Sequence, residues 1–160
     1  MRVHFISDLH LSTDRPALTG LFERYLAGPA RTAEQLYILG DLLEYWCGDD
    51  DTDDPLARRL CGALKDLSAS GCQVSFMAGN RDLLIGPAFA ERAGFTLLPE
   101  PTLIELDGQP TLLCHGDSLC TDDVAYQAYR TQVRDPVWQQ GFLAQALAAR
   151  KQFIQGLQIG

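Results

Sequence analysis

The chain of 160 residues is long enough for one domain with a buried core, and its 46% apolar and 21% charged residues are typical of a globular protein. No apolar run approaches the roughly 18 residues of a membrane span, and the first run is too short for a signal-peptide core, so we expect a cytoplasmic protein. The net charge of −8 argues against a nucleic-acid-binding surface.

Residues 1–123 alternate short apolar runs with helix-like stretches, which is the pattern of an α/β domain. In chain order, the predicted elements are a strand over 3–6, a helix over 16–26, a strand over 36–39, a helix over 55–67, a strand over 74–78 and a helix over 87–93. Strands over 102–106 and 111–114 flank the hairpin signal Asp107-Gly108, and Gln109-Pro110 is expected to lengthen the turn.

The segment after Asp123 differs from the rest of the chain in pattern and in charge. Residues 124–133 and 137–157 are predicted to be helices, with an Asp-Pro pair between them. Residues 1–123 carry a net charge of −11, and residues 124–160 carry +3. We therefore divide the chain into an N-terminal core, 1–123, and a helical cap segment, 124–160.

Polar side chains follow each predicted strand of the core where that strand ends. Asp8 and His10 follow the first strand, Asp41 the second, Asn80 the third and His115 the hairpin. Because ligands of α/β sheets bind beyond the carboxyl ends of the strands, we expect these side chains to face one another. Neighbouring glycines allow sharp turns and close approach to an ion or phosphate.

Carboxylates, imidazoles and an amide without a thiolate suit manganese, iron or zinc rather than calcium. A carboxylate such as Asp41 can bridge two ions, and ions about 3.5–4 Å apart can hold a phosphoryl group and activate a water. Each residue alone has a simpler explanation, because an Asp or Asn after a strand often caps a turn and a lone His usually packs. Their joint occurrence at strand ends favours a metal site, whereas His4, inside the first strand, is predicted to be structural.

Three other features have structural explanations. The five cysteines, without a C-x-x-C pair, are predicted to be reduced thiols. The acidic run 49–54 is predicted to be a solvated loop that caps the helix at Pro55. An apolar stripe on the last predicted helix is interpreted as packing against the core or the preceding helix, with a cap over acyl chains and anionic headgroups as the alternative; its residues are Phe142, Leu143, Leu147, Ile154 and Leu157.

The order and spacing of the polar motifs resemble the calcineurin-like metallophosphoesterase superfamily, whose blocks are D-x-H, G-D, G-N-[HR]-[DE], H and G-H-x-H. The first four correspond to Asp8-Leu9-His10, Gly40-Asp41, Gly79-Asn80-Arg81-Asp82 and His115. Stretches 5–11, 39–46, 79–84 and 115–123 are similar to the UDP-2,3-diacylglucosamine diphosphatase family of lipid A biosynthesis, in which an arginine, here Arg81, replaces a second histidine.

This resemblance implies a metallophosphoesterase β-sandwich flanked by helices, with a manganese-dependent hydrolase activity at the cytoplasmic face of a Gram-negative inner membrane. The implied reaction cleaves the pyrophosphate of UDP-2,3-diacylglucosamine to UMP and lipid X (2,3-diacylglucosamine 1-phosphate), with a metal-activated water attacking the α-phosphorus and no side-chain nucleophile. The implied ligands are Asp8, His10 and Asp41 for one Mn²⁺ and Asp41, Asn80 and His115 for the other, and the implied substrate contacts are Asn80, Arg81 and Asp123. The structural alternatives are an ion pair of Arg81 with Asp82 or Glu44, and a helix N-cap at Asp123.

The last superfamily block, G-H-x-H, has no counterpart, because no histidine follows His115. We therefore expect a truncated chain, a fragment or the product of a degraded gene, with an α/β fold incomplete at the C-terminus. Five of the family's seven ligand residues remain, so weak metal binding and little catalysis are expected. Two other hypotheses stay open: a metallophosphoesterase with another phosphoester substrate, and an inactive metal-binding remnant.

Overall fold

The computed structural model describes residues 2–115 and 131–159, with side chains up to Ile154. Four parallel strands form one sheet in the order β1 (Val3–Ile6), β2 (Gln35–Leu39), β3 (Gln73–Met77) and β4 (Thr96–Leu98). The first three were predicted to within a residue at each end. The fourth was missed, because three residues are too few to show a period.

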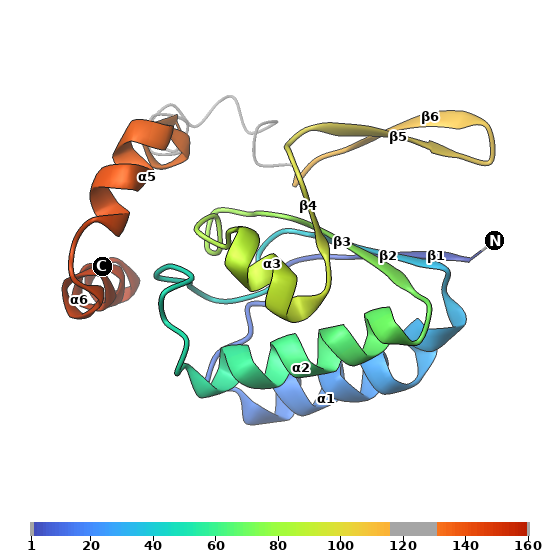
Figure 1. Cartoon of the computed structure of the whole chain (residues 1–160), viewed down its shortest axis with the longest axis horizontal. Helices are drawn as coiled ribbons and strands as arrows, with labels where there is room; N and C mark the ends of the chain where they lie inside the picture. Colours follow the sequence, from blue (N-terminus) through green and yellow to red (C-terminus); the bar gives the residue numbers. More distant parts are fainter. Residues whose placement is uncertain (1, 116–130, 160) are drawn as a thin grey trace.

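Three helices connect these strands, namely α1 (Pro16–Ala27), α2 (Pro55–Ala69) and α3 (Pro87–Ala93), and a 3-10 turn, η1 (Pro29–Thr32), precedes β2. Each α-helix begins with a proline, whose missing N–H is not needed in the first turn, so the sequence predicts all three starts. Parallel crossovers are right-handed, and each strand is added beside the previous one, so the three helices lie on one face of the sheet (Figure 1). The main core lies between these helices and β2 and β3.

A hairpin of β5 (Thr102–Leu106) and β6 (Gln109–Leu113) lies on the other face of the sheet (Figure 1). Leu113 and Ile104 of the hairpin pack against Tyr37 and Met77 of the parallel sheet in a second, smaller apolar cluster. The described residues thus form two facing sheets with helices outside one of them. This arrangement confirms the predicted α/β class.

The prediction of a lengthened hairpin turn is wrong. Leu106 pairs with Gln109, so the turn contains only Asp107 and Gly108, whose φ angles of 49° and 78° are those of a type I′ turn. Pro110 lies within β6 opposite Glu105. Antiparallel pairs alternate between hydrogen-bonded and non-hydrogen-bonded, so the pair next to the one that closes the turn tolerates a residue without an N–H.

The last helices are α5 (Pro136–Leu143) and α6 (Leu147–Ile159), and residues 131–134 are also helical. They lie beyond the carboxyl ends of the parallel strands (Figure 1). Residues 124–130 of the predicted helix 124–133 lie outside the described residues. No described helix combines the length and apolar character needed to cross a membrane.

The single helix predicted over 137–157 is wrong, because the chain breaks between α5 and α6. Nothing in Ala144, Gln145 and Ala146 marks a break locally, since alanine and glutamine are good helix formers. Arg150 makes hydrogen bonds at the break between the two helices. Its Nε donates to the carbonyl of Gln145 (3.0 Å), and its Nη1 donates to the carbonyl of Cys47 (2.6 Å). A contact distant in sequence therefore accompanies the change in chain direction.

The acidic run 49–54 caps α2 as predicted, since Asp54 accepts from the N–H of Ala57 (2.9 Å), whereas the prediction of a solvated loop holds for Asp50, Thr52 and Asp53 but not for Asp51. Asp51 is only 6% exposed and lies 3.1 Å from Lys151. Asp50 accepts from Arg150. Asp49 accepts hydrogen bonds from the N–H groups of Gly86 and Phe89 at the start of α3. It also accepts one from the indole Nε1 of Trp46. The run thus joins α2, α3 and α6.

Two smaller predictions are confirmed within the described residues. Cys47, Cys61, Cys72 and Cys114 are free thiols, and Cys120 lies outside the described part. His4 is a packed residue, whose Nδ1 lies 2.6 Å from the hydroxyl of Tyr25 and whose ring stacks on that of Tyr25.

Candidate metal centre

The ends of β1 and β2 are held together by backbone hydrogen bonds that continue past the strands. The N–H of Asp8 donates to the carbonyl of Gly40 (3.0 Å), and the N–H of His10 donates to the carbonyl of Asp41 (2.9 Å). The sheet thus brings residues 8–10 beside residue 41, and the backbone fixes their spacing before any side-chain contact is made.

Three of the residues at this edge have a left-handed backbone, with φ angles of 57° for Asp8, 49° for His10 and 55° for Asp41. Non-glycine residues rarely adopt this conformation, which costs about 1–3 kcal/mol per residue. Such strain is concentrated at functional sites, where the surrounding structure maintains it. Three strained residues within one small cluster therefore point to a binding site.

Two glycines make room for the cluster. A Cβ at Gly40 would lie 2.4 Å from Nδ1 of His115, and a Cβ at Gly79 would lie 2.4 Å from Oδ1 of Asp41. Gly40 also has a φ of 94°, which disfavours any other residue. The glycines of the G-D and G-N motifs are therefore required by close approach of the functional side chains.

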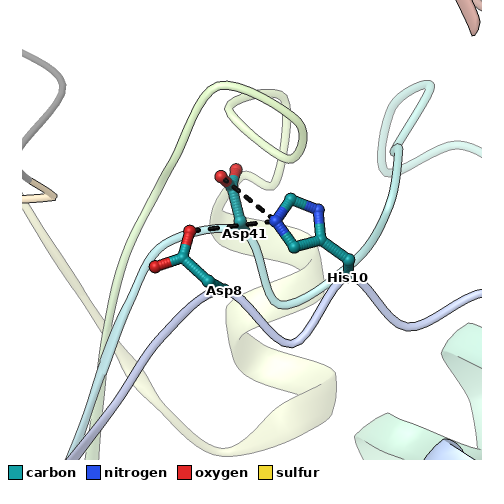
Figure 2. A group of neighbouring side chains, drawn as sticks. All are labelled: Asp8, His10 and Asp41. Atoms are coloured by element: carbon teal, nitrogen blue, oxygen red, sulfur yellow. Dashed lines mark ion pairs between the residues drawn. The ribbon is translucent and has the colours of Figure 1, made fainter.

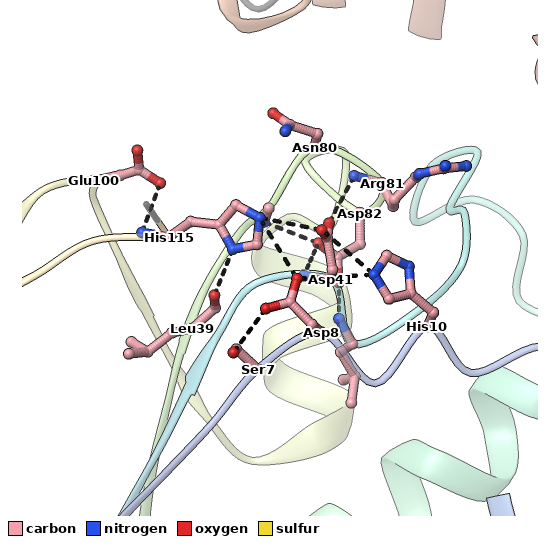
Figure 3. A network of polar contacts seen from close by, with 12 residues as sticks. Ser7, Asp8, His10, Leu39, Asp41, Asn80, Arg81, Asp82, Glu100 and His115 are labelled. Carbon is pink, nitrogen blue, oxygen red and sulfur yellow. Dashed lines mark hydrogen bonds and ion pairs between the residues drawn. The ribbon is translucent and has the colours of Figure 1, made fainter. Parts of the chain in front are cut away.

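Four of the five predicted ligand side chains, those of Asp8, His10, Asp41 and His115, converge (Figure 3), and Figure 2 shows the first three of them. Nε2 of His10 lies 3.8 Å from both Oδ1 of Asp8 and Oδ2 of Asp41. Nε2 of His115 lies 3.1 Å from Oδ2 of Asp41 and 4.0 Å from Oδ1 of Asp8. Ligand atoms of Asp8, His10 and Asp41 all lie within 4.8 Å of one another, so they could hold one ion. The donor set of carboxylate oxygens and imidazole nitrogens fits a divalent transition metal.

His115 is oriented by its backbone neighbour. Its Nδ1 lies 2.7 Å from the Leu39 carbonyl, which can only accept, so the proton is on Nδ1 and Nε2 faces Asp41. The hydrogen bond to Asp41, against the opposing effect of burial, raises the pKa of His115 to about 9. Burial alone would raise the pKa of Asp41, but the hydrogen bonds from His115 and the Arg81 N–H and the charge of both imidazoles lower it. Asp41 therefore remains a carboxylate available to a cation.

Asp82 connects the loops that follow β2 and β3. Its carboxylate is fully buried and accepts from four backbone N–H groups, those of Asp41 (3.2 Å), Leu42 (2.7 Å), Leu43 (3.2 Å) and Gly79 (3.0 Å). Burial raises the pKa of Asp82 to about 6, and the N–H donors act against that rise. The sequence places Asp82 in the G-N-R-D motif, but its role as a connector of two loops is seen only in the structure.

Asn80 and Arg81 lie at the end of the same loop but face elsewhere. The amide of Asn80 points away from the four converging side chains (Figure 3), and its oxygen lies 3.5 Å from Nη2 of Arg134. Nη1 of Arg81 lies 3.0 Å from Glu44, so the predicted structural alternative for Arg81 is present. Asp123, the third predicted substrate contact, lies outside the described residues. Glu44 and Arg134 are contacts that sequence analysis did not assign to the site.

A pocket of about 430 Å³ opens beside this cluster. Its polar wall includes Asp41, Asn80 and Arg81, and its other wall is apolar and includes side chains of α5 and α6. The aromatic part of that wall is a packed group, since Trp138 stacks on Phe142 and Phe153 meets Phe142 edge-on. The predicted apolar stripe thus contributes Phe142 and Ile154 to a pocket that also contains polar candidate site residues.

Together, an α/β fold and carboxylates and imidazoles gathered at strand ends form a candidate site for a divalent metal ion. No family model matches the chain. The chain is 53% identical over 157 residues to UDP-2,3-diacylglucosamine hydrolase of Aromatoleum aromaticum, covering 98% of this chain and 64% of that relative. It is 56% identical over 155 residues to the proteins of the same name from Xanthomonas campestris and Xanthomonas oryzae, covering 97% of this chain and 62% of each.

By sequence, the chain is thus similar to proteins named UDP-2,3-diacylglucosamine hydrolase, and it spans a little under two thirds of the length of these relatives. Among solved structures, the nuclease MPE of Pseudomonas putida overlays with a TM-score of 0.48 at 20% identity, covering 63% of this chain and 49% of that one.

Proposed function

We propose that this chain carries the metal-binding and phosphate-binding part of a manganese-dependent hydrolase that cleaves the pyrophosphate of UDP-2,3-diacylglucosamine to UMP and 2,3-diacylglucosamine 1-phosphate. The observation that carries the proposal is the convergence of Asp8, His10, Asp41 and His115 at the strand ends. The names of relatives that are 53–56% identical support the choice of substrate.

The proposed metal ligands are Asp8, His10 and Asp41 for one ion and Asp41, His115 and Asn80 for the other. When bound, divalent ions activate water and neutralise charge on phosphoryl oxygens. Arg81 lines the pocket beside Asp41 with a half-exposed guanidinium, which can donate two parallel hydrogen bonds to a phosphate. Asp123 is proposed as a further substrate contact on the strength of the motif alone.

The apolar wall of the pocket supports a lipid substrate. Trp138, Phe142, Phe153 and Ile154 line the same pocket as Arg81, so a ligand with a phosphate at one end and acyl chains at the other fits its chemistry. Val137, Leu143 and Phe153 are exposed on α5 and α6. We propose that this surface brings the protein to the cytoplasmic side of the inner membrane, where exposed apolar side chains can enter the headgroup region.

The test is UMP release from UDP-2,3-diacylglucosamine in detergent micelles with added Mn²⁺, with wild type beside Asp41→Asn. Asp41→Asn is expected to lower manganese affinity at least tenfold and to abolish release, because a shared carboxylate is lost. Glu23→Gln, far from the site in α1 and paired with Arg59, is the matched control. Manganese binding and UMP release that are unchanged in Asp41→Asn contradict the proposal.

The same assay separates the other hypotheses. Hydrolysis of a simple phosphodiester but not of the UDP-linked lipid indicates a metallophosphoesterase with another substrate. Manganese binding that depends on Asp41, without hydrolysis of either compound, indicates a metal-binding module without catalysis.

A further inference from the structure

Glu44 lies between a candidate metal ligand and the candidate phosphate-binding arginine, and its two carboxylate oxygens contact different partners. Oε2 lies 3.4 Å from Nδ1 of His10, and Oε1 lies 3.0 Å from Nη1 of Arg81. The three side chains come from three different loops, which follow β1, β2 and β3. One carboxylate therefore connects all three loops at the edge of the pocket.

The backbone holds Glu44 in this place. Its N–H donates to the carbonyl of Leu11 (2.9 Å), and the N–H of Leu11 donates to the carbonyl of Leu42 (2.9 Å). Leu11 and Leu43 also form a parallel bridge. The segments that carry His10 and Glu44 are thus paired beyond the ends of β1 and β2, so the approach of the carboxylate to the imidazole is fixed by the fold.

The contact with Glu44 orients the imidazole of His10. A carboxylate beside Nδ1 favours the tautomer with its proton on Nδ1, which leaves the lone pair on Nε2. Nε2 is the atom that faces Asp8 and Asp41. His115 has the same arrangement, with Nδ1 toward the Leu39 carbonyl and Nε2 toward Asp41. Both imidazoles therefore have an acceptor on the Nδ1 side and Nε2 toward the shared carboxylates, with a hydrogen bond at His115 and a longer ion-pair contact at His10.

The contact with Arg81 contributes little to stability. The Arg81 side chain is 48% exposed and that of Glu44 is 24% exposed, and exposed ion pairs contribute about 0–1 kcal/mol. The ion pair restrains the long side chain of Arg81 at the pocket wall, close to the candidate metal ligand Asp41. The pair thus matters more for orientation than for folding.

We propose that Glu44 is a positioning residue that holds His10 for the metal with one oxygen and Arg81 for a phosphate with the other, so that the two binding events are coupled. This inference rests on the proposed function, because it takes His10 as a ligand and Arg81 as a phosphate contact. Glu44 would thus be a functional residue of the site although it is not one of the proposed metal ligands.

The first test is a manganese titration by calorimetry of wild type, Glu44→Ala and Glu44→Gln, with Glu23→Gln as the matched control. Glu44→Ala is expected to weaken manganese binding about 10–100-fold, the usual effect of losing the partner of a ligating histidine. The manganese affinity of Glu44→Gln is expected to lie between those of wild type and Glu44→Ala, because the glutamine amide has only one accepting oxygen. Urea denaturation should show the free energy of unfolding of both variants within about 1 kcal/mol of that of Glu23→Gln, because the ion pair with Arg81 contributes about 0–1 kcal/mol.

A spectroscopic signature separates orientation from general loosening. In the metal-free, ¹⁵N-histidine-labelled chain, wild-type His10 is expected to show its proton on Nδ1, and Glu44→Ala a mixture of the two tautomers, with His115 unchanged. Equal manganese affinity in Glu44→Ala and wild type, or an unchanged tautomer of His10, overturns the role of Glu44 toward His10.

The coupling to Arg81 is tested with UMP in the presence of manganese, by a double-mutant cycle of Glu44→Ala and Arg81→Ala. An interaction of about tenfold between the two substitutions is expected, and additive effects overturn the role of Glu44 toward Arg81. If Asp41→Asn binds manganese as wild type does, the proposed metal centre itself fails. If Asp41→Asn loses manganese while Glu44→Ala keeps it, only the inference about Glu44 fails.

Discussion

The two walls of the pocket are held in different ways. On the core side, Asp8, His10 and Asp41 are fixed by backbone hydrogen bonds between neighbouring loops. On the other side, α6 contacts the acidic run through side chains, with the buried Arg150 paired with Asp50 and Lys151 paired with Asp51. Backbone pairing fixes geometry directly, whereas contacts made by long side chains also depend on the rotamers of those side chains. We therefore expect the metal-binding wall to be preorganised and the helical wall to adjust more readily to a ligand.

Removing the buried carboxylate under the core wall should have the largest effect. Asp82→Ala leaves four backbone N–H groups without their acceptor, and each buried unsatisfied donor costs about 1–3 kcal/mol. We expect the free energy of unfolding, measured by urea denaturation, to fall by about 3 kcal/mol or more. The control is Asp66→Ala, on the exposed side of α2, whose free energy of unfolding should stay within about 0.5 kcal/mol of the wild-type value. Equal stability of the two variants would show that the loops hold themselves without Asp82.

The next effect is steric and acts on the same wall. Gly79→Ala places a Cβ 2.4 Å from Oδ1 of Asp41, so we expect a loss of about 1–3 kcal/mol in stability and at least tenfold in manganese affinity. Gly62→Ala is the control, because a Cβ there has no heavy atom within 4 Å and lies in α2, where alanine is favoured by up to about 1 kcal/mol. Unchanged manganese binding in Gly79→Ala would mean that the core wall is less rigid than its geometry indicates.

The helical wall should respond locally rather than globally. Arg150→Ala removes donors to two carbonyls and to Asp50, so we expect a loss of about 1–2 kcal/mol and faster amide exchange in α6, measured by hydrogen–deuterium exchange. Manganese affinity should be unchanged, since Arg150 touches no candidate ligand. A fall in manganese affinity as large as that of Gly79→Ala would show that the two walls are not held independently. Arg58→Ala, exposed on α2, is the control.

The smallest expected effect is on the pH dependence of stability, through the carboxylate of Asp50. The hydrogen bond from Arg150 lowers the pKa of Asp50, so this carboxylate stabilises the folded state above its unfolded pKa, and the contribution is lost as pH falls through the lower folded value. The stability difference between wild type and Asp50→Asn should therefore shrink as pH is lowered from 5 toward 2.5, measured by thermal unfolding. Asp53→Asn, at an exposed position in the same run, serves as the control. A difference that grows on acidification would contradict the ion pair.

The core wall was predictable because its signals are local. An apolar run that ends in a glycine and a polar residue marks both a buried strand and the side chain at its end, as at Gly40-Asp41 and Gly79-Asn80. The same signals place Asp8, His10, Asp41 and His115 at one edge, where the structure brings them together. That these residues bind metal stays a prediction, as does the role of Asp123. The direction of the Asn80 amide could not be predicted, because its contact with Arg134 joins segments far apart in the chain.

The helical wall was predictable only in part, because the interactions that shape it join distant segments. The break before α6 and the burial of Asp51 both involve contacts between residues 47–51 and residues 150–151. Periodicity and propensity describe one segment at a time, so they extend a helix through Ala144–Ala146 and leave an acidic run in solvent. The proposed division at residue 123 stays a prediction.

His115 stands directly after the hairpin, whereas Asp8 and Asp41 belong to the parallel sheet. The hairpin meets that sheet through few buried side chains, chiefly Leu113. An ion shared by His115 and Asp41 would therefore act as a cross-link between the two layers, and its binding energy would become docking energy for the hairpin. Chelation would then release β5 and β6 before it disturbed α1 or α2.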